Sequence, residues 1–387
     1  MNWRMKSAKD WGRLGLRSNW KKMRVGDIID EIAMGPFGSN IKVESFVSTG
    51  IPVLNGSNLI GFTLSEKSFN YVTHEKALSL KKAVATRGDV VITHRGTLGQ
   101  IVYIPTTSKY ENYVISQSQF RVRCNKNILL PEFMVYYFHS KEGQHQLLSN
   151  SSQVGVPALA RPSSTFQELI IPIPSLEEQQ IIIDILKSLN KKIINNTTLN
   201  HHLEQMAQAI FTKICNEGKN AVLSDILTVC YGKDHKRLND GIVPCYGSGG
   251  IMRHVDKALY NNESVLIPRK GSLNNVLYIN EPFWTVDTMF YTQMTHPNVA
   301  KFVYFTVRDL DLIGMNVGSA VPSMTTAVLN ALEIVLPSDE TLVNFEESVS
   351  PMFLQIQANN AESAHLIALR DTLLPKLMSG ELSVADI

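Results

Sequence analysis

The stretch LIIPIPSLEEQQIIIDILKSLNKKIINNTTLNHHLEQMAQAIFTKI, residues 169–214, decides the fold. Its short apolar run with two prolines ends before Ser175, and Glu178 follows three residues later. A serine and a carboxylate at this spacing are typical of a helix N-terminal capping box. Neither glycine nor proline occurs between Ser175 and Glu217. The sequence therefore predicts a helix of about 40 residues, which would be roughly 60 Å long.

Apolar residues recur along this helix at alternating steps of three and four, which is the heptad pattern of a coiled coil. A single helix of this length needs a partner helix to bury such a stripe. We expect its seam to consist of Ile182, Ile185, Leu189, Asn196, Leu199, Leu203, Met206 and Ile210.

The partner helix lies in the same chain, because the pattern returns after a shift of 163 residues, with Pro174-Ser175 falling on Pro337-Ser338. A repeat of this length predicts two similar halves. We expect an α+β fold in which two globular blocks alternate with two long helices. The helices would pair as an antiparallel coiled coil about a pseudo-twofold axis. The second helix is expected to contribute Ile356, Asn359, Leu366, Leu369 and Leu373 to the seam.

Two asparagines occupy the middle of the predicted seam. Asn196 lies near the midpoint of the first helix, and Asn359 is its counterpart in the second. Midpoints meet in an antiparallel pair, so we expect the two asparagines to face each other and to fix the register, as a buried polar residue can. The alternative is that both are surface residues beside a slightly displaced seam.

The repeat also organises the globular blocks. Short β-branched runs separated by Gly, Pro, Asn or Ser predict strands, and residues 131–145 predict a helix with an aromatic face. In the second block, residues 264–272 correspond to 89–97 and residues 276–279 to 101–104. The expected division is an N-terminal basic arm at 1–19, a first block at 20–174, a first helix at 175–217, a second block at 218–337, and a second helix with a C-terminal tail at 338–387.

Composition limits the class of protein. The 387 residues are 44% hydrophobic with a net charge of +2, which suits globular domains. Residues 1–24 hold eight Lys and Arg against one Asp, so this arm either contacts a polyanion or is simply a solvated tail. None of the four cysteines forms a C-x-x-C pair, and no apolar run approaches the length of a membrane span. We expect a cytoplasmic protein with reduced thiols.

Several motifs, in this order and with this repeat, resemble the specificity (S) subunit of type I restriction-modification enzymes over about residues 20–385. The motifs are Trp20-Lys21-Lys22 before Gly26-Asp27-Ile28, the turn Gly35-Pro36-Phe37-Gly38-Ser39, the turn Arg95-Gly96-Thr97-Leu98-Gly99, the helix start Ile173-Pro174-Ser175-Leu176-Glu177-Glu178-Gln179, and the C-terminal Leu374-Pro375-Lys376-Leu377-Met378-Ser379-Gly380-Glu381-Leu382.

The resemblance implies two target recognition domains, each reading one half of a bipartite sequence in double-stranded DNA. The paired helices would set the spacer and dock two methyltransferase (M) subunits. Restriction (R) subunits would complete the complex, a type I site-specific deoxyribonuclease and adenine-N6 methyltransferase used in phage defence. S-adenosylmethionine would belong to M, and ATP and Mg to R. The S subunit itself would be non-catalytic, without cofactor or metal.

The residues agree with a non-catalytic role. The chain has no Asn/Asp-Pro-Pro-aromatic motif for adenine methylation and no G-x-x-x-x-G-K-[ST] phosphate loop. The neighbours His201 and His202 would point about 100° apart on a helix, which does not suit a shared metal ion.

The predicted DNA contacts lie in loops after strands. Phosphate contacts give affinity and base-edge contacts give sequence preference. Arg95 and Arg269 occupy corresponding turns, where each would pair with guanine, grip a phosphate, or only form a surface salt bridge. The candidate DNA-binding residues are Lys42, Asn55, Ser57, Asn58, Arg95 and Thr97 in the first block, and Tyr246, Ser248, Arg269, Lys270 and Ser272 in the second.

Two other functions stay open at this point. One is the specificity part of a split or fused type II-like restriction-methylation enzyme, and the other is a protein-interaction scaffold. If the chain is a specificity subunit, helices of about 60 Å predict half-site centres about 10 to 15 base pairs apart.

Overall fold

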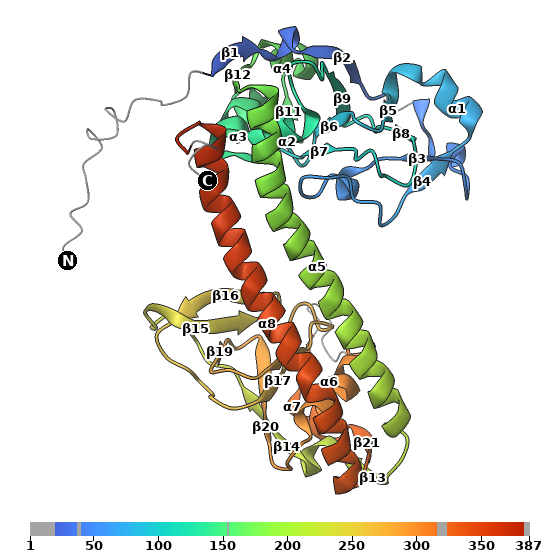
Figure 1. Cartoon of the computed structure of the whole chain (residues 1–387). Helices are drawn as coiled ribbons and strands as arrows, with labels where there is room; N and C mark the ends of the chain where they lie inside the picture. Colours follow the sequence, from blue (N-terminus) through green and yellow to red (C-terminus); the bar gives the residue numbers. More distant parts are fainter. Residues whose placement is uncertain (1–19, 37–39, 153–154, 316–322, 383–387) are drawn as a thin grey trace, which may run out of the picture. The chain divides into compact units, whose positions relative to one another are not determined.

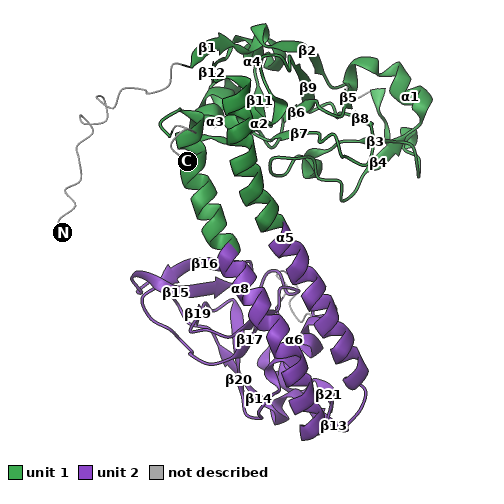
Figure 2. Cartoon of the chain, viewed as in Figure 1, with its two compact units in different colours: residues 1–194, 363–387 green, residues 195–362 purple. Residues whose placement is uncertain are grey.

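The computed structural model describes four segments of the chain (Figure 1), residues 20–36, 40–152, 155–315 and 323–382. The predicted basic arm (1–19), the last three residues of the Gly35–Ser39 turn and the last five residues of the C-terminal tail lie outside these segments. The chain forms two compact units (Figure 2). Unit 1 comprises residues 1–194 and 363–387, and unit 2 comprises residues 195–362.

Unit 1 is built on two four-stranded sheets. Its strands are β1 (Lys21–Arg24), β2 (Ile29–Met34), β3 (Ile51–Val53), β4 (Asn70–Val72), β5 (Val84–Thr86), β6 (Val90–Thr93), β7 (Ile101–Tyr103), β8 (Asn112–Val114), β9 (Gln119–Cys124), β10 (Ser151–Ser152), β11 (Ala158–Leu159) and β12 (Ile170–Ile173). One sheet has the order β2-β9-β6-β7, with antiparallel neighbours throughout. The other has the order β4-β3-β8-β5, in which β3 and β8 are parallel.

Unit 2 repeats this plan with fewer strands. They are β13 (Lys219–Val222), β14 (Leu227–Tyr231), β15 (Asp240–Gly247), β16 (Gly250–Val255), β17 (Ser264–Pro268), β18 (Leu277–Ile279), β19 (Trp284–Thr285), β20 (Met289–Met294) and β21 (Glu333–Leu336). The sheet β14-β20-β17-β18 corresponds to β2-β9-β6-β7 in strand order. The small sheet β16-β15-β19 again contains one parallel pair, β15 with β19. The predicted internal repeat is therefore confirmed.

The short helices cover the sheets. They are α1 (His74–Ser79), α2 (Pro131–His139), α3 (Lys141–Leu148) and α4 (Pro162–Glu168) in unit 1, and α6 (Ala300–Arg308) and α7 (Thr326–Asn330) in unit 2. The prediction of one helix over 131–145 is wrong, because Ser140 is extended and its Oγ accepts a hydrogen bond from the Gly143 N–H. Ser140 thus ends α2 and caps α3.

The two long helices are α5 (Leu176–Ile214) and α8 (Asp339–Met378). The capping box at the start of α5 is present: the Glu178 N–H donates to Ser175 Oγ over 3.2 Å, and the Ser175 N–H donates to Glu178 Oε2 over 3.0 Å. In unit 1, Arg370 Nη1 donates to Asn190 Oδ1 over 3.1 Å. In unit 2, Asn196 meets Asn359. From the first contact to the second, the residue number rises along α5 and falls along α8, so the pair is antiparallel, as predicted.

The seam between the helices differs in part from its predicted composition. Leu199, Met206 and Leu369 are 43%, 54% and 47% exposed, so their assignment to the seam is wrong. At each of these three points the next residue along the helix occupies the seam instead. Asn200 hydrogen-bonds to Asn359, Ala207 is fully buried, and Arg370 bonds to Asn190. The other predicted seam positions are buried or partly buried: Ile182, Ile185, Leu189, Asn196, Leu203, Ile210, Ile356, Asn359, Leu366 and Leu373.

The ends of the long helices belong to the hydrophobic cores of the units. In unit 1, Leu186 of α5 and Leu377 of α8 are fully buried with Phe133 of α2. In unit 2, Phe211 of α5 and Phe345 of α8 are buried with Phe302 of α6. Each globular block is therefore packed onto one end of the helix pair. Within the described segments, no helix combines the length and the hydropathy needed to cross a lipid bilayer.

Candidate nucleic-acid interface

One side chain joins two loops of unit 1 that contain predicted DNA-binding residues. The first contains a 3-10 turn (Gly56–Asn58) after β3, and the second is the segment 94–99 after β6. Gln100 Nε2 donates to the Gly56 carbonyl over 3.1 Å, while Gln100 Oε1 accepts from Thr93 Oγ1 over 3.0 Å. The amide of Gln100 therefore holds the two loops side by side.

Unit 2 contains the same connection. Asn275 Nδ2 donates over 2.9 Å to the carbonyl of Ser248, in the turn after β15. Asn275 stands just before β18, as Gln100 stands just before β7, and both belong to the loop that follows the preceding sheet strand. An amide at the same place in both copies suggests that these loops are built to act together. Sequence reasoning missed both residues, although a shared amide at matching repeat positions was a usable signal.

A third segment supports each turn. In unit 1 the Gly96 N–H donates to the Pro157 carbonyl over 2.8 Å, next to a bridge between Arg95 and Ala158. In unit 2 the Met324 N–H donates to the Arg269 carbonyl over 2.8 Å, next to a bridge between Lys270 and Ser323. Backbone hydrogen bonds thus fix both arginine-bearing turns.

Asn58 is not available to DNA, and its assignment as a DNA-binding residue is wrong. Its side chain is buried, with Nδ2 donating to the carbonyls of Ser65 and Ser68 over 3.0 Å each. Its Oδ1 accepts the Asn55 N–H over 2.9 Å, which closes a capping box. Asn58 therefore shapes the loop.

The other candidates of unit 1 are exposed. Asn55 Oδ1 accepts hydrogen bonds from the N–H and the hydroxyl of Ser57, so these two side chains form one polar group. Arg95 and Thr97 lie on the adjacent turn. Lys42 is exposed in a different segment, just before a 3-10 turn (Val43–Ser45). The structure thus brings together four of the candidates. Lys42 lies in a separate segment, and none of the described hydrogen bonds joins it to these loops.

Tyr246 is also misassigned as a DNA-binding residue. Its ring is buried against Phe283 in the core of the small sheet. Burial raises the pKa of Tyr246 to about 12, with a further contribution from the Glu281 carboxylate, to which the hydroxyl is hydrogen-bonded. The alternation of strand residues turns this side chain into the core, away from DNA.

The remaining candidates of unit 2 gather around one turn. Arg269 is held in place, because Nη1 donates to the Asp287 carbonyl over 3.0 Å and the guanidinium lies 5.2 Å from the Tyr231 ring centroid. Lys270 and Ser272 are exposed, and Ser248 is partly buried beside them. The turn therefore presents two cationic side chains and two hydroxyls.

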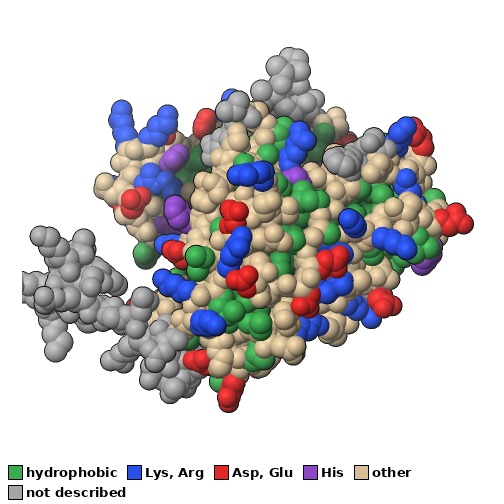
Figure 3. All heavy atoms as spheres, turned by 90° about the horizontal axis from the view of Figure 1, so that it is seen from above, with side chains coloured by type: hydrophobic (Ala, Val, Ile, Leu, Met, Phe, Trp, Pro, Cys, Tyr) green, Lys and Arg blue, Asp and Glu red, His purple; other side chains and the backbone are tan. Residues whose placement is uncertain are grey.

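The surface charge is mixed. Figure 3 shows Lys and Arg side chains interspersed with Asp and Glu on the face in view, in keeping with the net charge of +2. Within the described segments, no group of three or more His, Cys, Asp or Glu is placed to hold a metal ion.

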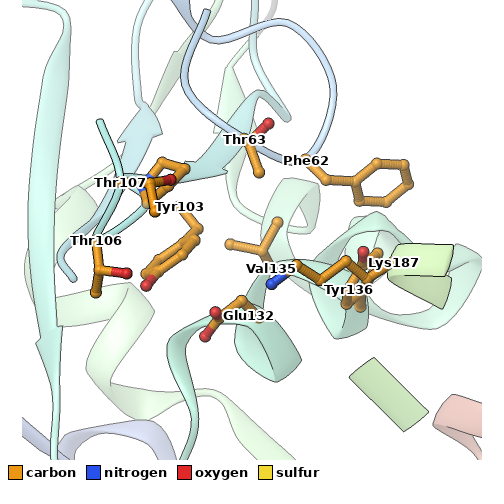
Figure 4. Close-up of a pocket in the computed structure, with 10 residues that line it drawn as sticks. Phe62, Thr63, Tyr103, Thr106, Thr107, Glu132, Val135, Tyr136 and Lys187 are labelled. Carbon is orange, nitrogen blue, oxygen red and sulfur yellow. The ribbon is translucent and has the colours of Figure 1, made fainter. Parts of the chain in front are cut away.

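A cavity of about 220 Å³ lies in unit 1 beside α2 and α5 (Figure 4). Phe62, Tyr103 and Tyr136 form much of its wall, and Glu132 and Lys187 add one charge of each sign. Burial raises the pKa of Tyr103 to about 12. Most small-molecule sites measure roughly 300 to 1,000 Å³, so we assign no ligand to this smaller cavity.

Comparison with known proteins shows which family the sequence matches. The family model for the type I restriction modification DNA specificity domain matches residues 17–205 and again residues 220–350. The MjaIX specificity subunit of Methanocaldococcus jannaschii is 23% identical, with 95% of each chain covered. The HindI specificity subunit of Haemophilus influenzae is 24% identical, covering 94% of this chain and all of the relative.

A solved structure shares the fold. It is an S subunit of a type I restriction-modification system from M. genitalium, with a TM-score of 0.64 and 17% identity, over 94% of this chain and 96% of that one. Since two copies of the family model together match most of the sequence, this chain belongs to the type I restriction-modification DNA specificity family.

Proposed function

We propose that this chain is the non-catalytic subunit that selects the DNA sequence in a type I restriction-modification complex. The observation that carries the proposal is the paired loop arrangement, fixed by Gln100 in unit 1 and by Asn275 in unit 2. Each arrangement places an arginine-bearing turn beside a second polar loop. Two copies with different side chains suit the reading of two different half-sites.

Unit 1 offers Asn55, Ser57, Arg95 and Thr97 to its half-site. Arginine contacts guanine or phosphate, and the hydroxyls and the amide contact base edges or phosphates. Unit 2 offers a different set, with Ser248, Arg269, Lys270 and Ser272. Because the two sets differ, the bipartite site is expected to be asymmetric.

The chemistry belongs to the partners in this proposal. Two methyltransferase (M) subunits bind S-adenosylmethionine and methylate adenine N6, and restriction (R) subunits use ATP and Mg to cleave unmodified DNA. The long helices serve as the spacer between half-sites and as the docking surface for M. The complex works in the cytoplasm, on double-stranded DNA.

The test is co-expression with a cognate methyltransferase subunit, followed by sequencing of methylated bases in the host DNA. The expected result is one bipartite motif with N6-methyladenine in both halves and a spacer of fixed length. Exchanging residues 20–174 for the corresponding block of a relative should change one half of the motif and leave the other unchanged.

Three outcomes contradict the proposal. Methylation without a bipartite motif rules out two recognition domains joined by a spacer. A stable complex that methylates no DNA favours the protein-interaction scaffold. Binding of S-adenosylmethionine by the isolated chain favours an enzyme with its own active site.

A further inference from the structure

Strands β15 and β16 of unit 2 form a ribbon whose tip is unusual. The turn at Ser248-Gly249 joins the strands, with Gly247 opposite Gly250 and Tyr246 opposite Ile251. Among the described strands, β16 pairs with β15 alone and is therefore an edge strand (Figure 1). Ile251 and Met252, directly after the turn, are 55% and 56% exposed. Two adjacent exposed apolar residues at a ribbon tip require an explanation.

Met252 occupies a β-bulge. Cys245 pairs with Arg253 and Tyr246 pairs with Ile251, so Met252 has no partner residue on β15. Bulges are found at sheet edges and beside functional sites, where they redirect a side chain. The Met252 side chain lies against Gly247, where an added Cβ would come within 2.5 Å of the sulfur. A bare glycine backbone therefore makes room for this methionine.

The tip is part of the candidate nucleic-acid interface. Asn275 holds the Ser248 carbonyl, and the hydroxyl of Ser248 faces Gly271 in the turn that carries Arg269 and Lys270. The ribbon tip and the arginine-bearing turn are thus one continuous surface. Whatever the turn contacts, Ile251 and Met252 lie next to it.

Charge favours DNA over an apolar protein as the occupant of this surface. Residues 231–272 contain seven Lys and Arg against four Asp and Glu. Lys270 is exposed beside the tip, as is His254, two residues beyond Met252. Basic side chains beside an apolar tip can contact phosphates while the tip itself faces an apolar group of a base.

We propose that this ribbon tip enters the major groove of the unit 2 half-site and that Ile251 and Met252 contact the 5-methyl group of a thymine. The inference rests on the proposed function and names one base, thymine, that unit 2 would recognise. The major groove, about 12 Å wide, admits a two-stranded ribbon, whereas the minor groove is about 6 Å wide. The thymine methyl is the apolar feature that the bases display in the major groove.

The experiment uses the complex of this chain with its methyltransferase subunit and a duplex carrying its bipartite motif. Each thymine of the unit 2 half-site is replaced in turn by deoxyuridine, which removes only the methyl group. The expected result is about a fourfold loss of affinity at one position, the size of one buried methyl group. Deoxyuridine in the unit 1 half-site serves as the comparison for the same complex.

Variants connect the effect to the ribbon. Ile251→Gln and Met252→Gln should each bind the thymine duplex more weakly, and at least one should no longer distinguish thymine from deoxyuridine. Ile242→Gln is the matched control, because Ile242 is 91% exposed on β15, roughly 16 Å along the strand from the tip. Its discrimination should equal that of the unchanged chain.

Two results overturn the inference while leaving the proposed function intact. One is specific binding in which no deoxyuridine substitution in the unit 2 half-site changes the affinity, or a unit 2 half-site that contains no thymine. The other is a methyl effect that persists unchanged in both glutamine variants. Absence of any bipartite methylation overturns the proposed function, and this inference with it.

Discussion

Asn196 donates a hydrogen bond from Nδ2 to the backbone carbonyl of Asn359 over 3.3 Å, and 163 residues separate the two positions. The same number superimposes the two halves of the sequence, so two copies of one repeat position touch. Both side chains are buried, at 3% and 5% exposure. Asn359 Nδ2 also donates to Asn200 Oδ1 over 2.7 Å. A buried polar group at this place is satisfied only in one register of the two helices.

Replacing one of these asparagines should destabilise the helix pair. Asn359→Leu removes the side-chain amide that donates to Asn200 Oδ1 and accepts from Gln355 Nε2, so these two part-buried groups lose that partner, at a cost of about 1–3 kcal/mol in the free energy of unfolding. The double variant Asn196→Leu/Asn359→Leu should recover part of this free energy and lose the unique register. Urea unfolding of the chain bound to its methyltransferase subunit measures both effects.

Asn195→Leu provides the control, because Asn195 is exposed on the same helix as Asn196. A double variant that unfolds with unchanged cooperativity and keeps one spacer length in its methylated motif would show that the asparagines do not set the register.

The two arginine turns should respond differently to lysine. Arg269 is oriented by the Asp287 carbonyl and by the Tyr231 ring, which lysine does not reproduce. Arg95 is exposed on its turn. We therefore expect Arg95→Lys to keep most of the affinity and Arg269→Lys to lose it, with a loss of about 1–3 kcal/mol if a guanine contact is removed.

Salt titration of DNA binding separates the roles of the arginines. A lost phosphate contact lowers the slope of log affinity against log salt by about 0.9, whereas a lost base contact relaxes the motif at one position. Lys141→Ala, exposed at the start of α3, is the control. Alanine at both turns with unchanged affinity and slope would remove both arginines from the interface.

Asn58 should matter for stability and not for the recognised sequence. Asn58→Ala removes hydrogen bonds to Ser65, Ser68 and Asn55, which should cost about 1–3 kcal/mol. Ser57→Ala, one residue away and exposed, should cost little. Thermal unfolding measures the first effect and methylome sequencing the second. A changed motif at unchanged stability would return Asn58 to the DNA-binding group.

The long helices were predictable because their signals are local. The Ser175–Glu178 capping box and the absence of helix breakers specify α5 without knowledge of its surroundings. The 163-residue repeat then places α8 in the same pattern. The seam was less predictable, because Asn200 and Arg370 enter it through hydrogen bonds that hydrophobic periodicity does not detect.

The loop residues were the hardest to assign. An asparagine whose side chain is buried in a turn and one whose side chain faces solvent look alike in a sequence, so Asn55 and Asn58 received the same role. Tyr246 was misassigned because the strand β15 extends further than the turn signals suggested, which places its ring in the core. The amide connections of Gln100 and Asn275 depend on loops far apart in the sequence, and only the folded chain brings them together.

The buried tyrosines predict how the protein responds to high pH. Burial is the largest cause in each case and raises the pKa of five tyrosines to about 12, namely Tyr103, Tyr113, Tyr137, Tyr246 and Tyr304. In the unfolded chain a tyrosine titrates near pH 10, roughly. Because the folded pKa is the higher one, the stabilisation is fully present below about pH 10 and is lost as the pH rises towards 12.

We therefore expect the folded chain to unfold between about pH 10 and 12, with a late step of tyrosinate absorbance that coincides with the loss of circular dichroism. In concentrated denaturant all 12 tyrosines should ionise in one early step, which is the internal control. Tyr304→Phe should reduce the late step by one tyrosinate, because this ring packs in the core of unit 2. A single early step with the circular dichroism intact would mean that these hydroxyls are ionised without unfolding, contrary to their burial.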